Sequence, residues 1–186
     1  MKVICYGDSN TYGYDPRGYF GGRYDAPWPE ILAAKTGWNI VNEGMNGREI
    51  PKIPVFFPKD TDLLLIMLGT NDLLQFRTPE DVCKKMERFL ESITLDRDKI
   101  LLIAPPSMQF GEWVQDQEII DSSIDLSKYF HDLAERLGIR FADAGKWKNI
   151  QTSYDGVHMT EEGHRAFAQG LIQIYAKENK LCWKPA

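Results

Sequence analysis

Short apolar runs alternate along the chain with longer stretches in which apolar residues recur at helical spacing. The short runs predict buried strands, and the periodic stretches predict helices that connect them. Strands and helices that alternate in this way build a parallel sheet, so we expect an α/β fold. The expected strands are Lys2–Tyr6, Asn39–Asn42, Asp62–Leu68, Lys99–Ala104 and Ile139–Asp143. The expected helices are Pro27–Thr36, Pro79–Ile93, Glu118–Leu137 and Thr160–Asn179.

Local signals support the ends and faces of these helices. Thr78 suits the N-cap of the second helix, with Pro79 at its first position, and Gly138 stands where the third helix should end. In the last helix one apolar face is predicted to lie on the sheet. Its members are Ala166, Leu171, Ile174 and Tyr175.

The composition is that of an ordinary globular protein, with 43% hydrophobic and 26% charged residues. No linker or repeat divides the chain, so we expect one domain over residues 1–186. The longest apolar runs, Leu63–Leu68 and Ile100–Ala104, fall well short of the ~18 residues that suggest a membrane span. A soluble protein without a membrane partner is the expectation.

Charge and cysteine content narrow the classes further. The 27 acidic and 22 basic side chains give a net charge of −5, and no basic cluster is present for nucleic-acid phosphates. Cys5, Cys83 and Cys182 are too widely spaced for a zinc site or a disulfide framework. Because Gly7 comes before an export signal could form, we expect a cytoplasmic protein.

Unusual polar residues follow four of the predicted elements. In an open parallel sheet, the loops after the carboxyl ends of the strands collect the chemistry. These loops contain Gly7–Gly13, Gly44–Arg48 and Gly69–Asp72, and a later segment contains Asp155–His158. We therefore expect all four segments to meet at one edge of the sheet.

Three of these residues have the chemistry of acyl transfer. Ser9 can act as a nucleophile, His158 can take its proton, and Asp155 can fix the imidazole tautomer. An Asp and a His three residues apart fit in one turn, with the second ring nitrogen free to face Ser9. The candidate donors to an oxyanion are the backbone N–H groups of Ser9 and Gly47 and the side-chain amide of Asn71. At position 47 we expect a side chain to obstruct the donor.

Each segment alone is an ordinary turn or helix-cap composition, and only the joint occurrence favours catalysis. Two other functions compete with a serine esterase. One is a metal-dependent phosphoesterase, but this sequence lacks the early Asp-x-His ligand pair expected of such an enzyme. The other is a non-catalytic carbohydrate-binding domain. The phosphoesterase would use Asp8, Asn71, Asp72, His158 and His164. No serine lies in a G-x-S-x-G elbow, which excludes an α/β-hydrolase.

The same residues resemble the four sequence blocks of the SGNH (GDSL-type) hydrolases. The blocks are Gly7-Asp8-Ser9, Gly47, Gly69-x-Asn71-Asp72 and Asp155-x-x-His158. The resemblance implies a three-layer α/β/α fold of flavodoxin type, Ser9 as nucleophile, Gly47 and Asn71 as oxyanion donors, and the Asp155/His158 pair. The stretch Gly7–Pro16 further resembles the arylesterase and acyltransferase branch, which acts on short acyl esters, although Tyr12 stands where that branch often has Trp. The second block offers Gly44 and Gly47, and the frame around Gly47 matches better.

The remaining polar and aromatic residues receive mostly structural interpretations. We expect packing or capping for His164, a local hydrogen bond for Asp8, and a similar role for Asp72. Several aromatic residues are candidates for an acyl or sugar pocket. They are Tyr12, Tyr14, Tyr19, Phe20, Trp28, Phe110 and Trp113, with Tyr12, Phe110 and Trp113 chosen as substrate-binding residues. We expect no cofactor and no metal, a small-molecule acyl ester as substrate, and leave open a homo-oligomer formed through Trp183.

Overall fold

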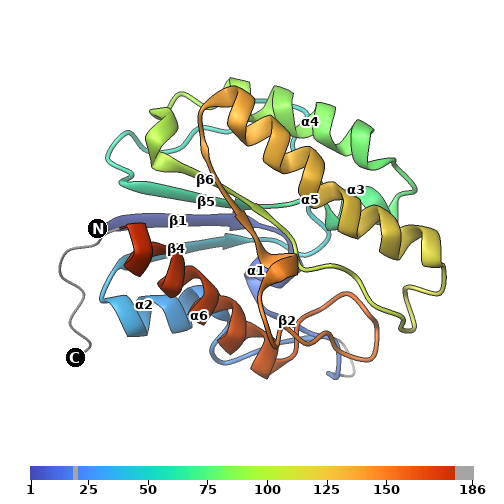
Figure 1. Ribbon diagram of the computed structural model, residues 1–186. Helices are drawn as coiled ribbons and strands as arrows, with labels where there is room; N and C mark the ends of the chain where they lie inside the picture. Colours follow the sequence, from blue (N-terminus) through green and yellow to red (C-terminus); the bar gives the residue numbers. More distant parts are fainter. Residues whose placement is uncertain (19–20, 179–186) are drawn as a thin grey trace.

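Five parallel strands form one sheet in the order β4-β1-β5-β6-β7 (Figure 1). The computed structural model describes residues 1–18 and 21–178. The strands are β1 Lys2–Gly7, β4 Asn39–Gly44, β5 Leu63–Met67, β6 Ile100–Ala104 and β7 Arg140–Asp143. In the register of β1, Gly7 lies between Gly44 and Met67, so these three strands end level with one another. The predicted five-stranded parallel sheet is confirmed.

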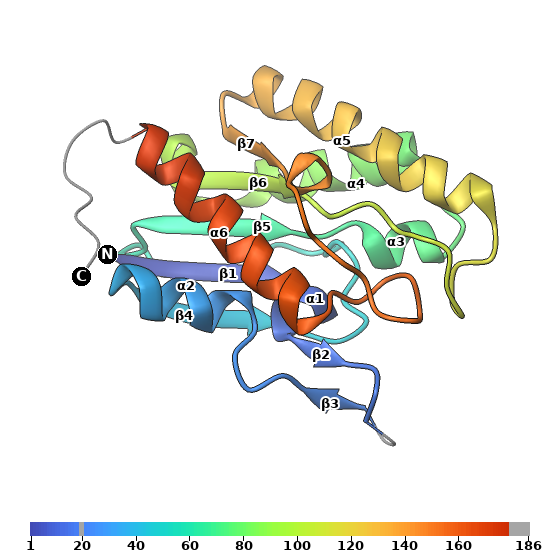
Figure 2. The same ribbon diagram turned by 60° about the horizontal axis from the view of Figure 1, so that its bottom comes forward.

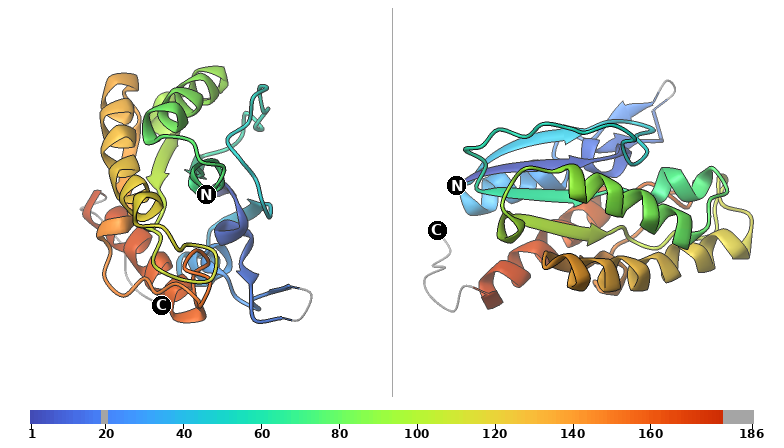
Figure 3. Two further views of the ribbon diagram at one scale, coloured as in Figure 1. Left: turned by 90° about the vertical axis from the view of Figure 1, so that its right-hand side faces the viewer. Right: turned by 90° about the horizontal axis from the view of Figure 1, so that it is seen from above.

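Helices cover both faces of this sheet and give the expected three-layer α/β/α arrangement (Figures 1 and 3). The helices α2 (Trp28–Thr36) and α6 (Glu161–Glu178) pack together on one face. The other face carries α3 (Thr70–Leu74), α4 (Pro79–Ser92) and α5 (Gln117–Leu137). The short helix α1 (Ser9–Tyr12) follows β1 at the carboxyl edge of the sheet.

Alternating side chains of the strands divide the core into two layers. In β1, Val3 and Cys5 pack toward α2 and α6, while Ile4 and Tyr6 pack toward α4 and α5. The predicted apolar face of α6 is confirmed for Leu171 and Tyr175, and Ile174 packs against the same core although it is only half-buried, as Ala166 also is. The buried face consists of Phe167, Ala168, Leu171, Ile172 and Tyr175. It keeps helical spacing but is rotated around the axis.

The helix ends follow the predicted caps. The Thr78 hydroxyl accepts a hydrogen bond from the Asp81 N–H at 3.2 Å, and Pro79 begins α4. Gly138 ends α5 with a φ of 65°, in the left-handed region that favours glycine. Pro27 and Ile93 are caps rather than helical residues. Asp62, Leu68, Lys99 and Ile139 lie just outside the strands predicted to contain them, and Asn179 and Cys182 lie outside the described residues.

Several short elements have no counterpart in the sequence prediction. The strands β2 (Tyr14–Asp15) and β3 (Gly22–Arg23) form an antiparallel hairpin that extends from the carboxyl edge (Figure 2). The helices α1 and α3, and the 3₁₀ turns Arg97–Lys99 and Ala144–Lys146, were also missed. Elements of two to five residues are too short to display a period, so the hydrophobic pattern cannot reveal them.

Candidate active site

Ser9 is the first residue of α1, directly after the carboxyl end of β1. Asp8 caps this helix, since its Oδ1 accepts a hydrogen bond from the Asn10 N–H at 2.9 Å. Gly13 ends the helix in the left-handed region, with its N–H bonded to the Ser9 carbonyl. The hydroxyl of Ser9 is therefore held on a short, doubly capped helix, and only 6% of the residue is exposed.

The structure brings Asp155 and His158 to this hydroxyl. His158 Nε2 lies 2.9 Å from Ser9 Oγ, and His158 Nδ1 lies 2.6 Å from Asp155 Oδ2. The other oxygen of Asp155 accepts hydrogen bonds from the backbone N–H groups of Val157 and His158, both at 2.9 Å. One carboxylate thus fixes both the imidazole ring and the turn that carries it.

The surroundings favour an ionised Asp155. Burial opposes ionisation, but the hydrogen bond from His158 and the two backbone N–H groups outweigh it, so the pKa of this carboxyl lies below its usual value. Asp8 has the opposite shift, because burial raises its pKa to about 6. The Asp8–Asn10 bond agrees with the local role expected for Asp8.

Asn10, which has no predicted role, connects α1 to the histidine turn. Its amide nitrogen donates to the Val157 carbonyl at 3.1 Å, and its amide oxygen accepts from the Met159 N–H at 2.8 Å. These two backbone groups flank His158, so the side chain of Asn10 hydrogen-bonds to the histidine turn on both sides of the histidine. The sequence shows an amide side chain directly after Ser9, but both of its partners lie about 150 residues away in the chain, so no local pattern points to them.

Two loops bring further donors to the same edge. The Asn71 amide donates one hydrogen bond to the Arg48 carbonyl at 3.1 Å, which leaves its second N–H available. Gly47 lies in a β-turn closed by the bond from the Arg48 N–H to the Met45 carbonyl at 3.2 Å. Within the described residues, the N–H groups of Ser9 and Gly47 have no protein acceptor. All three groups can donate to an anionic oxygen.

The backbone conformation of the turn gives a reason for glycine at position 47. A Cβ there would meet no atom of the described protein within 4 Å, so crowding does not explain it. Its φ of 71° does, since a positive φ at the third position of a β-turn, as in type II turns, favours glycine. Gly44 is the crowded position, because a Cβ would lie 2.0 Å from the Tyr12 nitrogen. Gly44 thus allows α1 to pack against β4.

Aromatic rings flank the imidazole of His158. Trp113 meets it edge to face with ring centres 5.2 Å apart, and Tyr14 lies 4.7 Å away on the hairpin strand β2. Trp113 is 53% exposed and Phe110 65%, and both belong to the segment 105–117. Tyr12 differs, since the Arg23 guanidinium covers its ring. Trp28 is a core residue packed on Phe167, while Tyr19, Phe20 and Trp183 lie outside the described residues.

The segment 105–117 is bonded to the turn that carries Asp155. The N–H groups of Gln109, Glu112 and Trp113 donate to the carbonyls of Gly156, Tyr154 and Asp155 at 2.9 to 3.1 Å. A Cβ on Gly111 would lie 2.3 Å from the Asp155 carbonyl carbon, so the two backbones are in direct contact. Viewed end on, the two segments run beside α1 (Figure 3, left).

The other titratable residues of the sequence analysis lie in separate places. His164 is fully buried on α6, where its Nδ1 accepts from the Trp28 N–H at 3.4 Å and its ring meets Tyr24. Burial lowers the pKa of His164 to about 3. Asp72 does not form the local bond expected, because its oxygens contact Lys85 and the Ile50 N–H. Among residues 1–18 and 21–178, no group of three His, Cys, Asp or Glu side chains could hold a metal ion.

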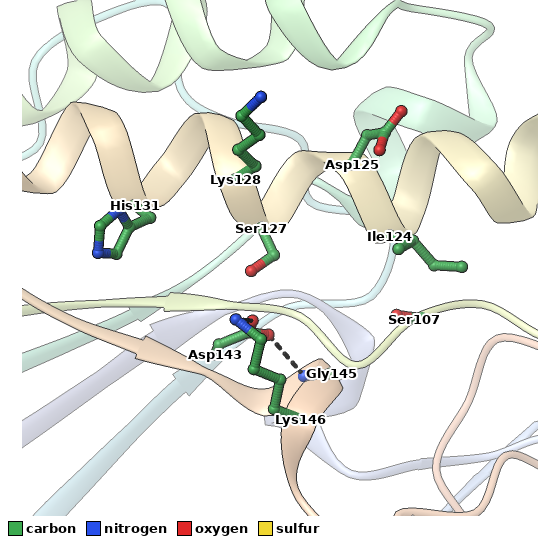
Figure 4. A pocket seen from close by; sticks show the side chains of 9 residues that line it. All are labelled: Ser107, Ile124, Asp125, Ser127, Lys128, His131, Asp143, Gly145 and Lys146. Carbon is green, nitrogen blue, oxygen red and sulfur yellow. Dashed lines mark hydrogen bonds and ion pairs between the residues drawn. The ribbon is translucent and has the colours of Figure 1, made fainter.

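A pocket of about 430 Å³ lies away from the triad, between α5 and the end of β7 (Figure 4). Ser127 points into it from α5, while Lys128 points away, and Asp143 bonds the Gly145 N–H at its floor. His131, at the rim, lies 3.4 Å from Asp132. None of the predicted catalytic, oxyanion or aromatic site residues lines this pocket.

Comparison with known proteins agrees with this geometry. Residues 5–166 match the model of the GDSL-like lipase/acylhydrolase family. The aryl esterase of M. smegmatis is 25% identical, with a TM-score of 0.76 over 95% of this chain and 99% of that one. A carbohydrate acetylesterase family member from Sinorhizobium meliloti is 25% identical, with a TM-score of 0.78 over 97% and 100%.

A member of the lipolytic G-D-S-L family from Veillonella parvula shares the fold, with 22% identity and a TM-score of 0.72 over 95% and 99% of the two chains. No curated protein matches this chain in sequence. Within the part of the chain described, no helix has the length and apolar character needed to cross a membrane.

Proposed function

Since the chain belongs to the GDSL-like lipase/acylhydrolase family and is a carboxylic ester hydrolase, we propose that it cleaves short-chain acyl esters, above all acetyl esters, with Ser9 as nucleophile. The observation that carries the proposal is the continuous chain of hydrogen bonds from Ser9 Oγ to His158 and on to Asp155. Such a chain is the arrangement that activates a serine hydroxyl.

The reaction proceeds through an acyl-enzyme. Ser9 Oγ attacks the ester carbonyl carbon while His158 Nε2 takes the hydroxyl proton, and Asp155 stabilises the resulting imidazolium. His158 then gives this proton to the departing alcohol, which leaves the acyl group on Ser9. Water, deprotonated by His158, attacks the acyl-enzyme, and collapse of the second intermediate releases the carboxylic acid and restores Ser9.

Each tetrahedral intermediate carries a negative oxygen next to three donors. We assign the stabilisation of this oxygen to the N–H groups of Ser9 and Gly47 and the free N–H of Asn71. These hydrogen bonds strengthen as charge develops, so they lower the barrier more than they tighten substrate binding.

The surroundings of Ser9 support a small acyl group. Only 6% of Ser9 is exposed, and the rings of Tyr14 and Trp113 lie against His158. The alcohol part of the ester faces the exposed aromatic side chains Phe110 and Trp113, which suit an aryl or sugar ring. The names of the two 25% identical structures, an aryl esterase and a carbohydrate acetylesterase, agree with this substrate class.

Hydrolysis of nitrophenyl esters of rising acyl length tests the proposal, with and without EDTA. Acetate should be the best substrate, and EDTA should have no effect. Ser9→Ala and His158→Ala should each lower kcat by roughly 10⁴-fold or more, and the double variant should lose little beyond either. Asp155→Ala should be the mildest of the three changes. Ser127→Ala, in the separate pocket, is the matched control and should keep full activity.

Three results would contradict this proposal. Turnover retained by Ser9→Ala would remove the nucleophile. Activity that needs a divalent metal would favour the phosphoesterase alternative. Sugar binding without turnover of any ester would favour a carbohydrate-binding domain.

A further inference from the structure

The two loops that carry the oxyanion donors are hydrogen-bonded to one another through Asn71 and Asp72. Asn71 donates to the Arg48 carbonyl at 3.1 Å, and the neighbouring Asp72 accepts the Ile50 N–H at 3.0 Å. The turn containing Gly47 is therefore bonded to the start of α3 at two points. The distance between the Gly47 N–H and the Asn71 amide depends on these bonds.

Lys85 reaches this junction from α4 and contacts a carboxylate of each loop. Its ammonium contacts Asp72 Oδ1 and also donates to Glu49 Oε2 at 2.7 Å. Asp72 is fully buried and the Lys85 side chain is 12% exposed, so their ion pair is shielded from water. The hydrogen bond from Lys85 also holds the pKa of Glu49 below its usual value. Arg77 adds an outer contact to Glu49 at 3.2 Å.

We propose that Lys85 is a positioning residue for the oxyanion donors, a role that rests on the esterase function proposed above. Its ammonium joins a carboxylate of the Asn71 loop to a carboxylate of the Gly47 loop and so fixes the separation of the two donors. The neighbouring Lys84 shows the contrast, since its side chain is 56% exposed and pairs with Glu80 on its own helix. An oxyanion hole requires this fixed separation, because its donors must already point at the position where the charge will form.

Lys85→Met tests the role, with Lys84→Met as the matched control. The Lys85 variant should lower kcat for acetyl ester by about 10- to 100-fold and change KM less than about 3-fold, as expected when donors are displaced by a fraction of an ångström to 1 Å. The dependence of kcat/KM on pH should keep its shape, because Ser9, His158 and Asp155 are untouched. Lys85→Arg retains the charge and should recover most of kcat, and Lys84→Met should match wild type.

A double-mutant cycle separates positioning from general stability. Asn71→Ala alone should lower kcat by ~100- to 1,000-fold, the usual effect of losing one oxyanion donor. In that background Lys85→Met should cost clearly less than in wild type, because one of the two donors that it aligns is gone. If Lys85→Met does not fold, Lys85→Met/Asp72→Asn removes both charges, keeps an acceptor for Ile50, and should show the same loss of kcat.

Two outcomes would overturn the role of Lys85. One is a folded Lys85→Met, or its charge-neutral double variant, with normal kcat, whatever its melting temperature. The other is a loss of equal size with and without the Asn71 amide. Either outcome counts against Lys85 only when Ser9→Ala is inactive. If Ser9→Ala still turns over ester, the proposed function itself has failed.

Discussion

Asn10 is the residue on which the alignment of serine and histidine most directly depends. Its side chain is buried beside Ser9 and bonds to the backbone on both sides of His158. Since Ser9 and His158 lie far apart in the chain, the distance from Ser9 Oγ to His158 Nε2 requires a link between α1 and the histidine turn. Asn10 is that link.

Asn10→Ala should therefore affect both catalysis and stability. Loss of two buried hydrogen bonds should lower the free energy of unfolding by about 1 to 3 kcal/mol. The loosened histidine turn should lower kcat by about 10- to 100-fold with little change in KM. Urea unfolding and ester turnover measure the two effects, and Asn39→Ala, exposed at the far end of β4, is the control. A folded Asn10→Ala with wild-type kcat would show that the turn holds its position without this link.

Residue type and order were enough to predict the catalytic candidates, but not their supports. Ser9, Asp155, His158 and Asn71 were predicted as candidates because each follows a predicted strand or precedes the last helix. The partners of Asn10 and Lys85 depend on which loops the sheet brings together, and no local pattern encodes that. The turn conformation that favours glycine at position 47 was not part of the prediction, because a positive φ cannot be read from the glycine alone.

At the scale of elements, the segment 105–117 is bonded to the turn that carries Asp155. Three backbone hydrogen bonds join it to the Asp155 turn, and it carries Trp113 against the His158 ring. The contact between Gly111 and Asp155 is possible only without a side chain at position 111. Trp113 and Asp155 are therefore positioned together.

Gly111→Ala should disturb both segments at once. Its Cβ would lie 2.3 Å from backbone atoms of Asp155 and Gly156, and backbone has no rotamer by which to give way. We expect about 1 to 3 kcal/mol of destabilisation and a fall in kcat of about 10- to 100-fold. Gly22→Ala is the matched control, since the nearest atom there is an ordinary 3.6 Å away. Unchanged turnover by Gly111→Ala would show that the segment can shift without moving Asp155.

The long elements were predictable because each presents a full period to the core. The centres of all five strands and four helices were placed correctly, and the differences lie at caps such as Pro27 and Ile93. The hairpin β2–β3 was missed, since two-residue strands show no alternation. Its residue Tyr14 nevertheless contacts His158, so the weakest sequence signal contributes to the site.

At the scale of the whole molecule, buried His164 makes stability depend on pH. Its pKa is about 3 in the folded protein and ~6.5 in the unfolded chain. Between these values the unfolded chain binds the additional proton, which stabilises the unfolded state. The contribution of neutral His164 to the free energy of unfolding is therefore complete above pH ~6.5 and is lost as the pH falls toward 3. Asp8 acts in the opposite direction, because its raised pKa of about 6 lets the folded protein bind a proton first.

Replacing His164 separates these two effects. For wild type, the His164 contribution should decrease by about 2 kcal/mol between pH 6.5 and pH 5. His164→Asn keeps an acceptor for the Trp28 N–H and removes the titration. The difference in free energy of unfolding between this variant and wild type should therefore shift by about this amount in favour of the variant from pH 6.5 to pH 5. Urea unfolding at both pH values measures the difference, with exposed His131→Gln as control. An equal pH response in wild type and His164→Asn would contradict the assignment.

The sequence separation of 149 positions between Ser9 and His158 also determines what a refolding experiment can report. Contacts between groups so distant in the chain form late, because a large loop must close before they gain any energy. Secondary structure and much of the core can return before α6 and the histidine turn dock onto α1. Recovery of ester turnover after dilution from urea will therefore follow this final docking, while far-ultraviolet circular dichroism will follow the earlier steps. The rate at which ester turnover recovers is thus expected to report the last step of folding.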